Sequence, residues 1–162
     1  MPAEAKFTID VLVFRPIGSL TTTTIAMTLA GAVPNPGEGG ATTPSGVTLV
    51  GNYFIRVNKY VAGANPDDPD EPMKLKFYLT NRKYLLQGIA FSNRDQGAGN
   101  NLGQAAFTTI EIGPEPGTNE RVLTVTNARG VGKKQSYDYL ILIQQVSDGA
   151  VGIIDPEMEN ET

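Results

Sequence analysis

Four carboxylates crowd into residues 65–72 and could serve as ligands for a metal ion. The acidic residues of this segment are Asp67, Asp68, Asp70 and Glu71. Calcium takes roughly six to eight hard oxygen ligands at flexible geometry, and acidic clusters supply them. Three prolines hold the segment extended, however, and it contains no Asp-x-Asp-x-Asp-Gly loop. These features favour a solvated acidic turn over a calcium site. The four carboxylates are the candidate ligands if calcium binds, and no other cofactor is expected.

A second polar cluster lies on a glycine-containing loop, residues 93–104. Its candidate ligand-binding residues are Asn93, Arg94, Asp95, Asn100 and Asn101. Amide and carboxylate groups gathered in this way can hydrogen-bond sugar hydroxyls, which would suit a lectin-like protein. The alternative is an ordinary surface loop, because Asn, Asp and Gly are common loop residues.

The residue types on which many enzymes depend are missing. The chain contains no His, which removes imidazole as a general base and zinc ligand, and no Cys, which removes thiolate metal sites. Glu111 and Glu120 lie on neighbouring expected strands, but nothing in the sequence brings them into one site. Residues 130–134 fail as a phosphate-binding loop, because position 134 is Lys where Ser or Thr is needed. We therefore expect a protein that is not an enzyme.

Composition and charge indicate one folded domain, residues 1–162. A chain of 162 residues can bury roughly two-thirds of the surface that its unfolded form exposes.

The net charge of −4 argues against a nucleic-acid partner, because neutralising phosphates requires a basic face. No run reaches the ~18 apolar residues of a membrane-spanning helix, and no signal segment is evident. We expect a cytoplasmic protein with no membrane partner.

Alternation of apolar and polar residues runs through most of the chain and predicts strands. Residues 7–13 and 73–80 each present one apolar and one polar side. Residues 136–155 predict a hairpin that turns at residues 147–149. Its first arm is apolar on both sides, which favours a place in the middle of a sheet. About ten such segments, spaced at roughly 8–12 residues, predict an all-β, single-domain antiparallel β-sandwich, immunoglobulin-like or jelly-roll-like.

Other segments connect or flank these expected strands. The Thr-rich residues 19–29 predict a strand, whereas the Gly/Pro-rich residues 31–46 predict a long loop. Residues 47–61 are expected to be extended. Residues 1–5 are expected to form a free N-terminal arm, and residues 155–162 a polar tail along the surface.

Two stretches resemble known families. Residues 152–162 follow a Tyr-rich strand and an Asp-Gly turn and contain Asp155-Pro156. In that order they resemble the DP-EP family of small, uncharacterised bacterial proteins, although Glu161 is followed by Thr162 where that family has Pro. Residues 7–13, Phe-Thr-Ile-Asp-Val-Leu-Val, resemble the start of the AidA/PixA inclusion-body proteins, which are β-rich and accumulate in cytoplasmic particles. The resemblances imply a β-rich bacterial protein and bring no catalytic residues.

The expected function is a structural or assembly role, by self-association into a homo-oligomer or by binding another protein. Strand edges need partners, and the expected pairing edges are residues 19–29 or the first strand with its N-terminal arm. The alternative is a small-ligand or glycan-binding lectin-like module that uses residues 93–104, with calcium at the acidic turn.

Overall fold

The computed structural model describes residues 3–35, 40–43, 47–51, 54–57, 73–93, 107–114, 121–127, 135–154 and 157–160. These residues form strands, joined by turns and short connections, and the part of the chain described contains no helix. The strands are β1 (Ala3–Val13), β2 (Thr24–Leu29), β3 (Val33–Asn35), β4 (Gly40–Thr42), β5 (Val47–Val50), β6 (Phe54–Val57), β7 (Met73–Leu79), β8 (Tyr84–Asn93), β9 (Phe107–Pro114), β10 (Arg121–Asn127), β11 (Gln135–Gln145), β12 (Val151–Ile154) and β13 (Glu157–Asn160).

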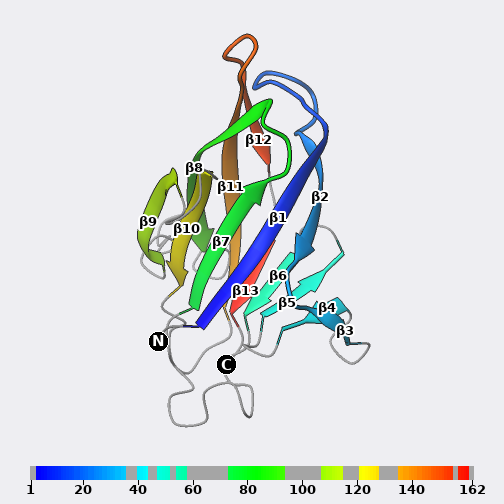
Figure 1. Cartoon of the computed structure of the whole chain (residues 1–162), viewed down its shortest axis with the longest axis vertical. Coiled ribbons are helices and arrows are strands. Elements are labelled where there is room, and N and C mark those ends of the chain that lie inside the picture. The colour runs from blue at the N-terminus through cyan, green and yellow to red at the C-terminus, as the bar shows by residue number, and fades with distance from the viewer. Residues whose placement is uncertain are drawn as a thin grey trace.

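The strands form two sheets that pack face to face as a sandwich (Figure 1). The first sheet has the order β2-β1-β7-β10-β9. The second has the order β12-β11-β13-β6-β5-β4-β3, and β8 pairs with the other side of β11. The all-β sandwich predicted from the sequence is therefore confirmed. Its sheets are not wholly antiparallel, because β1 pairs with β7 and β13 pairs with β6 in parallel.

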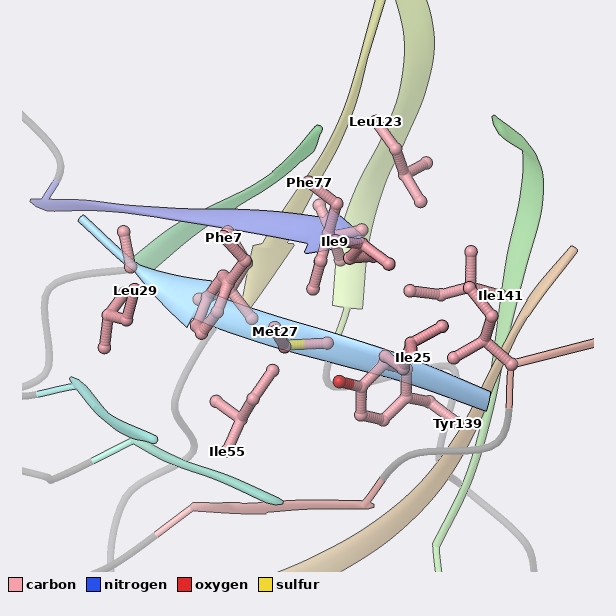
Figure 2. Close-up of a cluster of buried hydrophobic side chains, with 14 of the residues drawn as sticks. Phe7, Ile9, Ile25, Met27, Leu29, Ile55, Phe77, Leu123, Tyr139 and Ile141 are labelled. Carbon is pink, nitrogen blue, oxygen red and sulfur yellow. The ribbon is translucent and has the colours of Figure 1, made fainter. Parts of the chain in front are cut away.

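The core fills the space between the sheets and follows the period of two in the sequence. Phe7 and Ile9 of β1 point inward, as does Phe77 of β7, and all three are fully buried. The rings of Phe7 and Phe77 stack with their centroids 5.2 Å apart. Tyr139 and Ile141 of β11 enter from the second sheet, and Figure 2 shows these side chains meeting in one cluster. Alternation places an apolar residue inward at every second position, which fixes the register of each strand.

The hairpin predicted at residues 136–155 is formed by β11 and β12. The pair runs from Ile141 opposite Ile154 to Gln144 opposite Val151. Gly149 has a φ of 73°, a left-handed conformation that glycine adopts without strain. Within the turn, the backbone N–H of Ala150 donates to Oδ1 of Asp148 at 2.9 Å. β11 lies inside its sheet, as expected from a strand that is apolar on both sides.

Both chain ends differ from the sequence-based expectation. Residues 3–5 belong to β1, where Ala3 pairs with Met73, and are not a free arm. Residues 157–160, expected in a surface tail, form β13 between β11 and β6. The first strand was an expected edge, but β1 is paired on both sides, with β2 and β7. The expectation failed in each case because partners distant in sequence supply the backbone pairing.

Three connections also differ. Residues 31–46, expected to be a loop, contain the short strands β3 and β4, which pair with each other. Residues 47–61, expected to be one extended segment, are broken after β5 at Gly51, whose φ is 64°. The strand expected over residues 19–29 begins only at Thr24, and residues 19–23 belong to the connection before it.

Candidate functional site

Most of the residues proposed from the sequence as ligands lie outside the described part of the chain. The residues outside it are Asp67, Asp68, Asp70, Glu71, Arg94, Asp95, Asn100 and Asn101. The backbone of Asn93 ends β8, opposite Tyr137 of β11. The calcium site and the glycan site therefore stay predictions.

The described residues bring no catalytic cluster together. Among them, no group of three or more Asp or Glu residues is placed to hold a metal ion. Glu111 is exposed on β9, whereas its proposed partner Glu120 falls outside the described ranges. Burial raises the pKa of the Tyr139 hydroxyl well above its usual value, but this group lies in the core. The described part of the chain likewise contains no helix long and apolar enough to cross a membrane.

An apolar surface lies on the solvent side of the second sheet, where β8, β11 and β12 run side by side. Because Tyr139, Ile141 and Ile143 of β11 point into the core, Leu140 and Leu142 between them point outward. The register extends this surface to both neighbouring strands. We define the outer apolar face by its members, Leu85, Gly88, Ala90, Leu140, Leu142, Val151 and Ile153.

The outer apolar face carries no charged residue. In the pairing of β8 with β11, Gly88 lies opposite Leu142 and Ala90 lies opposite Leu140. Leu140 is 37% exposed, and Leu142 is half-buried. At the end nearest the hairpin turn, the face is bounded by two amides, where Nε2 of Gln87 donates to Oε1 of Gln144 at 2.8 Å. The leucines form a raised row on β11, beside a lower row of small residues on β8.

The edge strands of the first sheet are open to a different degree from β12, an edge strand of the second sheet, whose outer backbone is partly bonded. β2, the Thr-rich strand, lies at one edge of the first sheet, and β9 lies at the other. Beyond the start of β2, the backbone N–H of Thr23 donates to the carbonyl of Ile153 at 3.1 Å. Next to it, the backbone N–H of Ile17 donates to the carbonyl of Val151 at 2.8 Å. The connection between β1 and β2 therefore covers the outer edge of β12.

The other notable surface is one end of the sandwich, which we call the loop end and define as residues 12–23, 80–83 and 146–150. In Figure 1 the hairpin turn between β11 and β12 stands at the top, beside the connection between β1 and β2. Five of the eight large apolar residues found exposed in the described chain lie here. They are Leu12, Val13, Ile17, Leu20 and Val146.

Side-chain contacts hold the loop end in place. Thr23 is buried, and its Oγ1 accepts the backbone N–H of Arg15 at 2.9 Å and donates to the carbonyl of Arg15 at 3.2 Å. The ring of Phe14 stacks on Tyr84, with centroids 5.5 Å apart. The register of β1 against β2 shifts between Val11 and Val13. The exposed apolar residues therefore stand on a fixed frame.

Sequence reasoning missed the loop end and partly found the outer apolar face. The sequence predicts that β11 is apolar on both sides and lies in the middle of a sheet, but it does not predict that the second side faces solvent. Ile17 and Leu20 lie in a Gly/Ser/Thr-rich connection in which apolar and polar residues do not alternate. Apolar residues in such a connection are the sequence feature that could have predicted their exposure.

No family model matches the chain, and no curated protein matches it. Among solved structures, the chain is similar to an inclusion body protein, PixA, from Burkholderia cenocepacia, with a TM-score of 0.48 and 9% sequence identity. The similarity covers 99% of this chain and 95% of that chain. PixA belongs to the family that residues 7–13 resemble, whereas these comparisons do not return the DP-EP family. Function therefore has to follow from the residues of the chain itself.

Proposed function

We propose that the protein is a non-enzymatic β-sandwich that works by self-association, and that two copies meet through the outer apolar face. One observation carries this proposal. β11 is apolar on both sides. One side packs into the core, and the other side, with Leu140 and Leu142, faces solvent. Exposed apolar surface of this kind is typical of interaction sites.

The surface favours a second copy of the chain as its partner. A two-fold axis brings the same patch of both copies together, so the patch must complement itself. The raised row of Leu140 and Leu142 can pack against the low row of Gly88 and Ala90 in the other copy, and the reverse contact forms at the same time. Because none of the residues that define the face is charged, these residues bring no like charges together when the face packs against itself.

The dimensions of the face predict a weak interaction. Three strands at about 4.8 Å spacing and about five residues at ~3.4 Å each give a face of a few hundred Å². A stable interface buries about 800 Å² on each partner. We therefore expect association that is reversible and detectable only at high protein concentration.

Sedimentation equilibrium over a concentration series tests the proposal. Leu140→Glu places a charge in the centre of the face, and we expect the dissociation constant of the dimer to rise by about tenfold or more. Leu12→Glu is the matched control, because Leu12 is also an exposed leucine on a strand but lies at the loop end. This control should associate like the unmodified chain.

Two results would count against the proposal. A chain that stays monomeric at the highest soluble concentration has no self-association to explain. Equal association of the Leu140→Glu and unmodified chains would place the contact elsewhere, for example at the edge of β2. A melting temperature for Leu140→Glu close to that of the unmodified chain ensures that the variant reports on association and not on folding.

A further inference from the structure

The exposed apolar residues of the loop end do not contribute to the core. Leu20 is 104% exposed and Ile17 is 60% exposed, on a connection whose backbone is bonded to β12. Val146 begins the neighbouring hairpin turn, and its backbone N–H donates to the carbonyl of Lys83 at 2.8 Å. The connection between β1 and β2, the turn between β11 and β12 and the turn between β7 and β8 therefore form one surface that presents apolar side chains to solvent.

Basic residues stand among these apolar side chains. Arg15, Arg82 and Lys83 are exposed at the loop end. The two acidic residues nearby have local hydrogen bonds: Oδ1 of Asp148 accepts from Ala150 within the turn, and Oδ1 of Asp10 accepts from Thr80. These bonds leave both carboxylates charged, but residues 12–23, 80–83 and 146–150 contain the three basic residues and a single acidic residue, Asp148. The loop end is therefore locally basic, although the whole chain has a net charge of −4.

This combination matches the surface of an anionic lipid bilayer better than a second copy of the same end. Apolar side chains can enter the boundary between headgroups and acyl chains, while Arg and Lys keep their charges at the headgroup level. Two loop ends facing each other would bring like charges together. The acidic groups elsewhere on the chain act weakly, because salt screens charges over about 8–10 Å.

We propose that the loop end is a peripheral membrane-contact surface, in which Leu20, Ile17 and Val146 enter the bilayer boundary and Arg15, Arg82 and Lys83 meet anionic headgroups. Contact of this kind needs no membrane-spanning helix. The proposal departs from the expectation of no membrane partner, which rested on the lack of a spanning or signal segment. It is independent of self-association through the outer apolar face.

Vesicle flotation with the full chain tests this assignment. The unmodified chain should float with vesicles that mix phosphatidylserine and phosphatidylcholine, and added salt should weaken the binding. The double variant Ile17→Ser/Leu20→Ser should bind roughly tenfold more weakly. Arg82→Gln/Lys83→Gln should lose most of the preference for anionic over neutral vesicles. Val33→Ser is the control, because Val33 is 63% exposed but lies in β3, far from the loop end in Figure 1.

Three outcomes would overturn the proposal. The first is no flotation of the unmodified chain with either kind of vesicle. The second is equal binding by the Ile17→Ser/Leu20→Ser and Val33→Ser variants. The third is a loss of self-association by Ile17→Ser/Leu20→Ser when no lipid is present, because that result would identify the loop end as a protein interface.

Discussion

Gly152 of β12 lies so close to Phe14 that a Cβ added at position 152 would be 2.7 Å from Cε2 of the ring. The same Cβ would lie 2.9 Å from the carbonyl oxygen of Arg15 and 3.0 Å from Oγ1 of Thr23. Pro16 also forms a bridge with Gly152. The connection between β1 and β2 can therefore reach the edge of β12 only because this residue has no side chain.

Replacing this glycine should loosen the loop end. We expect Gly152→Ala to lower the free energy of unfolding by about 1–3 kcal/mol, because the ring could shift but the backbone of Arg15 cannot move without breaking its bonds to Thr23. Chemical denaturation measures the difference. Gly113→Ala is the control, because nothing lies within 4 Å of a Cβ added there. If both variants lose the same stability, the close approach at Gly152 has no energetic role.

The hydroxyl of Thr23 should stabilise the same connection. Thr23→Val keeps the shape of the side chain but leaves the N–H and carbonyl of Arg15 without their bonds to Oγ1. Such a loss inside a buried site costs about 1–2 kcal/mol. Hydrogen exchange should become faster at the amides of Ile17 and Thr23, both of which bond to β12.

Thr28→Val, at an exposed position of β2, serves as the control for the missing hydroxyl. Its stability should stay within about 0.5 kcal/mol of the unmodified chain. Unchanged exchange at Ile17 in the Thr23→Val chain would mean that the backbone bonds alone hold the connection.

Local pattern predicted the strands that supply the core. In β1 and β7 every second residue is apolar, and the central ones, such as Phe7, Leu75 and Phe77, are buried, whereas Val13 at the end of β1 is exposed. The turn at Asp148 and Gly149 was also predictable, because few residue pairs adopt its geometry as easily. In both cases the determining interactions lie within a few residues along the chain.

Pairing between distant segments could not be predicted in this way. β13 consists of Glu157–Asn160, a polar sequence whose place between β11 and β6 depends on partners far along the chain. The parallel pairing of β1 with β7 likewise joins segments that no hairpin turn connects. A period of two predicts a strand and its inward side, but it does not name the neighbours.

The candidate surfaces depended on exposure, which is a property of the whole fold. The sequence showed that Leu140 and Leu142 make β11 apolar on both sides, but not that the second side faces solvent. Leu12 and Val13 continue the apolar pattern of β1 and were expected to behave as strand residues. They are exposed because β1 runs past the end of β7 and its register against β2 shifts there.

The aromatic stack in the core should be sensitive to a change of shape. Phe77 lies between Phe7, at 5.2 Å between ring centroids, and Tyr139, at 6.2 Å. Phe77→Leu removes both ring contacts and leaves unfilled volume, so we expect the free energy of unfolding to fall by about 1–3 kcal/mol. Thermal and chemical denaturation measure the change.

Leu12→Ala, which truncates an exposed leucine, is the control and should change stability by less than about 0.5 kcal/mol. A Phe77→Leu chain as stable as this control would show that the core can repack around the smaller side chain.

The hydroxyl of Tyr139 should make stability depend on pH in the alkaline range. Burial raises the pKa of this group well above its usual value of 10.0 in the folded chain. Below about pH 10 the group is protonated in both states, so its effect on folding does not change with pH. Above that pH the unfolded chain releases a proton that the folded chain keeps. The free energy of unfolding should then fall by up to about 1.4 kcal/mol per pH unit.

Tyr139→Phe removes this ionisation and isolates its contribution. Urea denaturation of both chains from about pH 8 to about pH 11 gives the difference in stability, in which the effects of the other ionisable residues largely cancel. The unmodified chain should lose stability relative to Tyr139→Phe only above about pH 10. Parallel curves over the whole range would mean that the phenolate forms without unfolding, and that Tyr139 is reached by water in the folded state.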